Sequence, residues 1–176
     1  MTHIMKRILI TCLVLAGIIS GCATVQSIVR STFPYSATLI IPASGRTGSN
    51  QSAVSTLTSV DQIFTGQGTT GSTQSLRIAS ARINSVNPSS QSLGVLSSVR
   101  IYLTRSDGSG EVLIASRNDI SSGTGNSLVL DIDNSRFLDD YINGGGARVR
   151  MEYVLRQSLN VDVSVRASLT FTTTAQ

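Results

Sequence analysis

Histidine, lysine, tryptophan and cysteine are almost absent from this sequence. The chain has one histidine and two cysteines and no tryptophan, and its single lysine is Lys6. His3, Lys6 and Cys12 all lie in the first 21 residues. If that segment is removed on export, the mature chain has no histidine, no lysine and one cysteine, Cys22. Such a chain cannot form an internal disulfide.

These absences exclude several kinds of catalytic site from the mature chain. It cannot build a Ser-His-Asp or Cys-His system, a lysine Schiff base or a zinc site of histidine and cysteine. A hydrolase based on two carboxylates stays chemically open. Such enzymes usually hold sugars on aromatic platforms, and the chain has four tyrosines and four phenylalanines. We therefore expect a protein that is not an enzyme and has no cofactor.

The N-terminal segment has the three parts of an export signal. Lys6 and Arg7 are followed by an apolar run over residues 8–19 and then by the small residues Ser20 and Gly21. This run is shorter than the roughly 20 apolar residues of a membrane-spanning helix. Both Met1 and Met5 remain open as the first translated residue.

The run Ile19-Ser20-Gly21-Cys22 resembles the lipobox of bacterial lipoproteins. The resemblance implies a signal peptide over residues 1–21, removed so that Cys22 becomes the first residue and carries covalent lipid, including acyl chains such as palmitate. Stable anchoring takes two or more chains. The alternative is ordinary cleavage after Ala23. Since Ala23 rather than aspartate follows the cysteine, the resemblance implies the outer membrane, with the periplasmic and surface faces both open.

The formal charge of +4 includes Lys6 and Arg7. Without residues 1–21 the chain has 12 arginines against 10 acidic residues. The arginines are spread over many expected strands, which is typical of a solvated surface and not of a nucleic-acid interface. We expect a membrane contact through the lipid and no nucleic-acid partner.

The mature chain is long enough for one domain with a sizeable core. We expect a lipidated tether over residues 22–32 and a single domain over residues 33–176. From Phe33 onward apolar residues recur with a period of two, which predicts half-buried strands. The segments 43–52 and 65–75 are rich in glycine, serine and threonine and are expected to be loops. The expected strands are 35–42, 54–64, 76–86, 99–103, 111–116, 127–133, 148–157 and 161–171.

Turn and cap residues add detail to this pattern. Residues 107–110 predict a hairpin turn, and the short segment 158–160 suggests an antiparallel hairpin between the last two strands. One short helix is expected over 135–143, capped by Asn134 or Ser135. Its buried stripe would consist of Phe137, Leu138, Tyr141 and Ile142.

Seven or eight strands with such turns predict an all-β fold, an antiparallel Ig-like β-sandwich. A small β-barrel is the alternative. The plan is similar to small envelope lipoproteins of Ig-like sandwich type and to lipid-anchored pilin subunits. No diagnostic residues assign the mature domain to a family.

Asp131 and Asp133 are the candidate calcium ligands. Calcium takes six to eight oxygen ligands, and two residues two places apart on a strand share a face. The EF-hand order is not met, because no glycine stands at its sixth position and no glutamate at its twelfth. A solvated strand face that leads into a helix cap is the favoured alternative.

Arg148, Arg150 and Arg166 are the candidate binding residues on the outer faces of the last two strands. Arginine binds carboxylates and phosphates in a bidentate manner, so these side chains predict an anion-binding or protein-docking face. Cross-strand charge pairing is the favoured alternative. Tyr102 faces away from its apolar neighbours on the strand and is the one exposed aromatic candidate for ligand stacking, unless a second sheet covers it.

The leading hypothesis is a lipid-anchored, non-enzymatic envelope protein that binds or scaffolds another envelope component, with an envelope protein as its partner. A pilin-like or adhesin-like surface subunit is the second hypothesis, in which the strand ending in residues 169–172 would pair with a neighbouring copy. The third is a carboxylate-dependent or calcium-assisted domain that binds or hydrolyses glycans through Asp131, Asp133 or Glu152.

Overall fold

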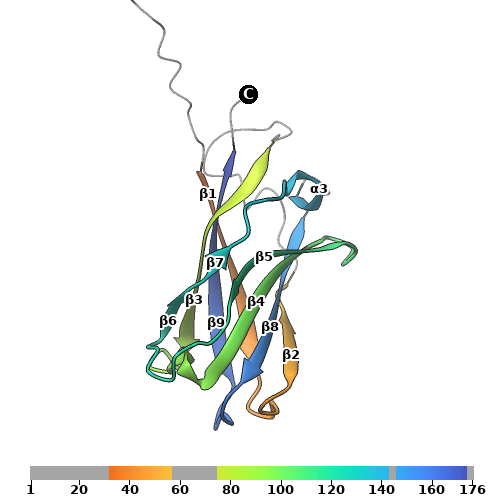
Figure 1. Ribbon diagram of the computed structural model, residues 1–176. Helices are drawn as coiled ribbons and strands as arrows, with labels where there is room; N and C mark the ends of the chain where they lie inside the picture. Colours follow the sequence, from red (N-terminus) through yellow and green to blue (C-terminus); the bar gives the residue numbers. More distant parts are fainter. Residues whose placement is uncertain (1–31, 57–74, 143–145, 174–176) are drawn as a thin grey trace, which may run out of the picture.

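The computed structural model describes residues 32–56, 75–142 and 146–173. These residues form nine strands and one short α-helix, and every strand pair is antiparallel. The strands are divided between two sheets that enclose the core (Figure 1). The predicted β-sandwich is therefore confirmed, and over the described residues the sheets do not close into the alternative barrel.

The four-stranded sheet has the order β1-β9-β3-β6 and the five-stranded sheet the order β2-β8-β4-β5-β7. The first consists of β1 (Thr32–Ile41), β9 (Val163–Thr173), β3 (Leu76–Asn87) and β6 (Ser127–Val129). The second consists of β2 (Asn50–Val54), β8 (Ala147–Leu155), β4 (Leu96–Arg105), β5 (Glu111–Arg117) and β7 (Asp131–Ile132). A 3-10 turn, η2 (Leu93–Val95), precedes β4, and α3 (Asp139–Ile142) precedes β8.

The core lies between the sheets and is formed mainly by alternate residues of the strands, as the period of two predicts. The alternation is interrupted at irregularities in the pairing of β3, β4 and β5. In β8 the inward side chains Val149, Met151, Tyr153 and Leu155 are at most 1% exposed. The hairpin predicted at residues 107–110 joins β4 and β5 and is confirmed. Val161, the first residue of the strand predicted over 161–171, is 50% exposed, and β9 begins only at Val163.

The hairpin predicted at residues 158–160 is wrong. β8 belongs to the five-stranded sheet and β9 to the four-stranded sheet, so residues 156–162 cross from one sheet to the other. Two strands that face the same core from opposite sheets show the same alternation as two strands of a hairpin, so the pattern could not distinguish them. Both edges of β9 are paired, with β1 and with β3. The last strand is therefore not free to pair with a neighbouring copy in this fold.

The strand predicted over residues 127–133 is divided. β6 pairs with β3 and β7 pairs with β5, so the chain changes sheets at Leu130. Leu130 is 4% exposed, and its N–H donates to the carbonyl of Ala81 at 3.0 Å. The chain can leave the first sheet here because this contact satisfies the buried amide.

The strand predicted over residues 54–64 differs from the one observed. β2 begins at Asn50, inside the predicted loop 43–52, and meets the predicted strand 54–64 only at Val54. Residues 57–64 of that strand, and all of the predicted loop 65–75 except its last residue, lie outside the described residues.

The helix is shorter than the predicted segment 135–143. Leu138 and Ile142 are buried as expected and Tyr141 packs against the core, whereas Phe137 is 54% exposed. Phe137 precedes the helix and lies outside its buried stripe. Just after it, the Leu138 N–H donates to the carbonyl of Leu76 at 2.8 Å, which fixes this segment along β3.

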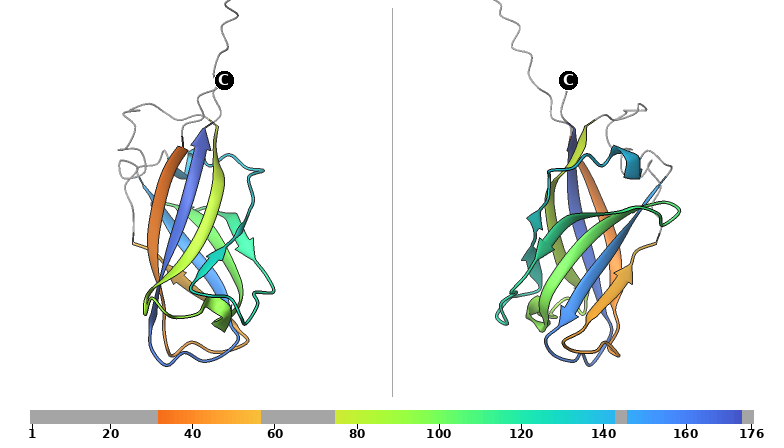
Figure 2. Two further views of the ribbon diagram at one scale, coloured as in Figure 1. Left: turned by 90° about the vertical axis from the view of Figure 1, so that its left-hand side faces the viewer. Right: turned by 45° about the vertical axis from the view of Figure 1, so that its right-hand side comes forward.

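The two ends of the sandwich differ. Thr32 pairs with Thr172, so the first and last described strands meet at one end, where α3 also lies (Figure 1). Four connections lie at the opposite end (Figure 2), and we call them the loop end: residues 42–49, 88–95, 118–126 and 156–162. None of the helices in the described ranges has the length and apolar character needed to cross a membrane.

Candidate binding surfaces

Arg150 is the centre of the predicted arginine and tyrosine surface. It lies on the outer face of the five-stranded sheet, in register with Tyr102, and its guanidinium carbon is 4.5 Å from the centroid of the Tyr102 ring. Its Nη2 donates to Glu111 at 2.6 Å, its Nε donates to the same carboxylate, and its Nη1 donates to Glu152 at 2.8 Å. The Tyr102 hydroxyl donates to Glu152 at 3.2 Å.

The positive charge of Arg150 is fully matched within this network by two carboxylates. Hydrogen bonds to Glu111 and Glu152 raise the pKa of Arg150, and the hydrogen bond from Arg150 lowers the pKa of Glu152. Burial, followed by the nearby Glu152 carboxylate, raises the pKa of Tyr102. Because Arg150 is held by two carboxylates and covers the Tyr102 ring, neither is available to a ligand in this arrangement. The geometry is that of cross-strand charge pairing.

The other predicted residues are divided between the two sheets. Arg148 lies beside Arg150 on the same face of β8, and its Nε is buried with no hydrogen-bond partner among the described residues. Arg166 lies on β9, on the outer face of the four-stranded sheet. The expectation that all three arginines share one face is therefore wrong, because it depended on the wrong hairpin.

Asp131 and Asp133 have separate partners. Asp131, in β7, forms an exposed ion pair with Arg117 at 3.1 Å. Asp133, just after β7, accepts hydrogen bonds from the Ser135 amide at 3.0 Å and from its hydroxyl at 2.6 Å. These bonds lower the pKa of Asp133. Within the described ranges no three His, Cys, Asp or Glu side chains form a group that could hold a metal ion.

The loop end is held together by an arginine that joins three of its connections. Arg156 donates through Nη1 to the carbonyl of Gly94 at 3.2 Å and through Nη2 to the carbonyl of Ile120 at 2.5 Å. Its own N–H donates to the carbonyl of Val95 at 2.7 Å. Residues 156–162 are thereby fixed to η2 and to the segment 118–126.

Further contacts fix the same segments to each other. Three hydrogen bonds join residues 88–95 to 118–126: Ser92 Oγ to Thr124 O (2.5 Å), Leu93 N to Gly125 O (2.8 Å) and Asn126 Nδ2 to Ser89 O (2.8 Å). The backbones also touch, because a Cβ at Gly94 would lie 2.2 Å from the carbonyl oxygen of Ser122. Most other side chains here are small and polar and lie exposed to solvent. The backbone of these three connections is thus held in one arrangement and carries an exposed polar surface.

The four-stranded sheet has no acidic residue in any of its strands but contains Arg77, Arg82 and Arg166. The sheet is seen from its outer side in Figure 2, left. Hydroxyl residues are the largest group among its other outward side chains, beside the exposed Ile40, Val86 and Val129, and we call this surface the hydroxyl-arginine face. The hydroxyl residues of this face are Thr32, Ser36, Thr38, Ser80, Ser127, Ser164, Ser168, Thr170 and Thr172. The sequence held a signal for it that we missed, which is the lack of acidic residues in the expected strands 35–42 and 76–86.

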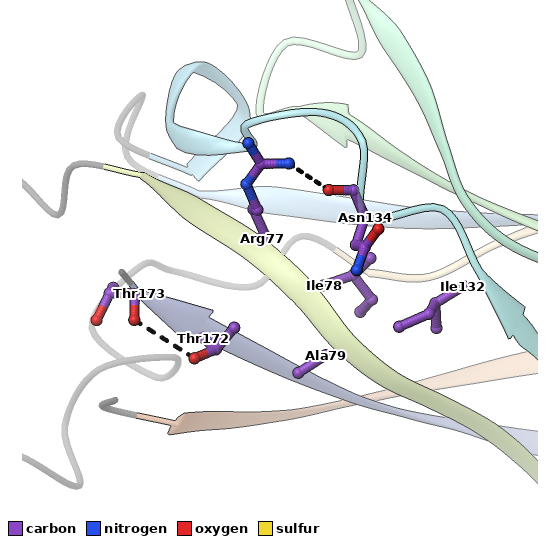
Figure 3. Close-up of a pocket in the computed structure, with 7 residues that line it drawn as sticks. All are labelled: Arg77, Ile78, Ala79, Ile132, Asn134, Thr172 and Thr173. Carbon is purple, nitrogen blue, oxygen red and sulfur yellow. Dashed lines mark hydrogen bonds between the residues drawn. The ribbon is translucent and has the colours of Figure 1, made fainter. Parts of the chain in front are cut away.

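A cavity of about 310 Å³ adjoins this face where β3 extends beyond β6 (Figure 3). Arg77 and Asn134 lie at one side of it, and the Arg77 Nη1 donates to the carbonyl of Asn134. The Arg77 guanidinium carbon also lies 4.0 Å from the ring centroid of Phe137. The exposed Phe137 ring is therefore partly covered by an arginine.

The comparisons with known proteins give a fold likeness and no family. No family model matches the chain, and no curated protein matches it by sequence. A structure of carbohydrate-binding modules from the β-sandwich superfamily is similar over 78% of this chain and about half (54%) of that chain, with 8% identity and a TM-score of 0.29. A structure of desmodium yellow mottle tymovirus is similar over 84% of this chain and 89% of that chain, with 8% identity and a TM-score of 0.27. At these TM-scores neither likeness bears on function.

Proposed function

We propose that this chain is a lipid-anchored, non-enzymatic protein of the bacterial envelope that binds an envelope protein through its loop end. The observation that supports the binding role is the preformed loop end, in which Arg156 and the contact at Gly94 hold three connections in one arrangement. Loops held by a rigid sandwich are common binding sites. Connections whose backbone is already fixed before contact lose less conformational entropy when a partner binds.

The residue types and their environments support a role without catalysis. The mature chain lacks histidine and lysine. Glu111 and Glu152 both form ion pairs with Arg150, and the hydrogen bond from Arg150 lowers the pKa of Glu152. An ionised Glu152 cannot serve as the proton donor that a two-carboxylate hydrolase needs.

The lipobox supports the anchor, and a direct test is available. We expect mass spectrometry of the protein purified from membranes to find an N-terminal Cys22 with its acyl chains. Replacing Cys22 by serine is expected to release the protein from the outer membrane fraction. A mature N-terminus at Thr24, after cleavage behind Ala23, would refute the anchor.

Crosslinking in intact cells tests the binding role. A photoreactive amino acid is placed at Asn118 or Asn160, two exposed loop-end positions, and at Val54 as a control, which is 55% exposed on β2. We expect one dominant envelope protein from both loop positions and not from Val54, with a lower yield when Arg156 is also replaced by alanine.

Two results would contradict this proposal. The same collection of abundant proteins from all three positions would mean that the loop end has no specific partner. Ladders of this protein crosslinked to itself would favour an assembling surface subunit instead.

A further inference from the structure

We infer that the hydroxyl-arginine face rests on the anionic lipid headgroups of the membrane that holds the anchor. The inference deepens the proposed function, since it depends on the lipid at Cys22. It begins from charge: the four strands contain three arginines and no acidic residue. An anionic membrane surface is complementary to such a face.

None of the three guanidinium groups forms an ion pair with a carboxylate of the described residues. Arg82 donates to the hydroxyl of Ser127 at 3.1 Å, and Arg77 donates to the carbonyl of Asn134. In the described part of the chain the ion pairs belong to Arg117 and Arg150, both on the five-stranded sheet. The net positive charge of the hydroxyl-arginine face is therefore available to an external anion.

The arginines are distributed over the face and do not form one cluster. Arg77 is in register with Thr172, Arg82 with Ser168 and Arg166 with Asn84. They thus lie at different heights along the strands, with hydroxyl groups between them. Hydroxyl and guanidinium groups both donate to phosphate oxygens. An array of donors spread along three strands fits an extended lipid surface better than it fits a single small anion.

The tether brings this face to the membrane. Thr32 is ten positions after Cys22 in the chain, and it lies on the face at one end of β1. A chain of that length spans at most about 35 Å, so the anchor keeps the face close to the headgroups at a high effective concentration. Each arginine near an anionic surface raises the equilibrium constant between the bound and the free orientation of this face roughly five-fold. Three arginines together raise it roughly a hundred-fold.

The experiment measures which face of the anchored protein lies near the headgroups. The lipidated protein is reconstituted into vesicles of phosphatidylcholine, with or without phosphatidylglycerol. Because Cys22 is acylated, a cysteine introduced at Ser168 on the hydroxyl-arginine face, or at Ser98 on the opposite face, is the only site for a fluorescent donor. Energy transfer to an acceptor on the lipid headgroups reports the distance.

We expect phosphatidylglycerol to make transfer clearly stronger from position 168 than from position 98, and high salt to remove the difference because it screens the charges. The double variant Arg82→Gln, Arg166→Gln is expected to remove it too. Arg100→Gln with Arg117→Gln, the same charge change on the other sheet, is expected to leave it intact.

Equal transfer from the two positions in phosphatidylglycerol vesicles would overturn this inference alone. A protein that does not float with the vesicles would refute the lipid anchor and this inference with it. Equal transfer in vesicles, combined with protection of position 168 from a thiol reagent in intact cells, would assign the face to an acidic protein instead.

Discussion

Replacing Gly94 by alanine perturbs the loop end at its tightest contact. The new Cβ would lie 2.2 Å from the carbonyl oxygen of Ser122 and 2.7 Å from its carbonyl carbon. Both atoms belong to the backbone, so no side-chain rotation can relieve the overlap. One of the two segments must move by about 1 Å to restore ordinary van der Waals contact, and this movement disturbs the hydrogen bond from Arg156 to the Gly94 carbonyl.

Overpacking of this kind costs about 1–3 kcal/mol, and we expect the upper end because the obstacle is backbone. For a domain of this size each kcal/mol lowers Tm by about 2–4 °C. The predicted loss is therefore about 6–12 °C, at about 3 kcal/mol. Thermal unfolding followed by circular dichroism, on the mature chain with Cys22 replaced by serine, measures it.

Gly125→Ala is the matched control, in the neighbouring segment of the loop end. A Cβ there would meet nothing within 4 Å, and Gly125 has no left-handed φ that alanine would strain. We expect this variant to be neutral or slightly stabilising. The packed arrangement of the loop end is wrong if Gly94→Ala has the Tm of the wild type. It is also wrong if Gly94→Ala and Gly125→Ala lower the Tm equally.

Three further predictions concern Arg156 and the network around Arg150. Arg156→Ala loses two carbonyl partners and is expected to cost about 2 kcal/mol, with faster hydrogen exchange in residues 118–126; unchanged exchange there would contradict its bracing role. Arg150 lowers the pKa of Glu152 in the folded protein. The ionised carboxylate therefore stabilises the fold at pH values above about 4.3, the pKa of an unfolded glutamate. This stabilisation is lost as the pH falls through the lower pKa of the folded state. Unfolding free energies between neutral and acidic pH should therefore decline less steeply in Glu152→Gln than in the wild type, and equal slopes would refute this linkage. Tyr102→Phe removes one hydrogen bond and keeps the contact with Arg150, so it should cost at most about 1 kcal/mol, whereas a larger loss in urea unfolding would mean that the hydroxyl has a partner beyond Glu152.

The alternation of apolar and polar residues predicted most of the long strands and missed the places where the chain changes sheets. β8 was found because its alternate residues face the core along its whole length. β3 and the hairpin of β4 and β5 were found although irregularities interrupt their alternation, because enough inward apolar residues remain on either side of each one. Residues 127–133 alternate just as well, yet the chain leaves one sheet for the other at Leu130. Alternation reports only whether a side chain is buried, and both sheets bury their inward side chains in the same core.

The site predictions had the same weakness. Tyr102 and Arg150 were expected to point outward and they do, but the sequence could not show that Glu111, 39 residues from Arg150, would neutralise that arginine. Arg166 was placed on the wrong sheet through the wrong hairpin. The loop end could not be predicted either, because its contacts join residues such as Gly94 and Arg156 whose distance depends on strand order.

The position of β9 has a consequence for the order in which the chain can fold. β9 lies between β1 and β3, so the four-stranded sheet has no continuous hydrogen bonding until residues 163–173 have emerged. Until then β1 has no partner in this sheet and β3 has only the short β6, so the four-stranded sheet cannot be completed. Folding of this sheet therefore waits for the strand that is synthesised last among those described. Under the export that the proposed anchor requires, this order would keep the chain unfolded while it crosses the membrane.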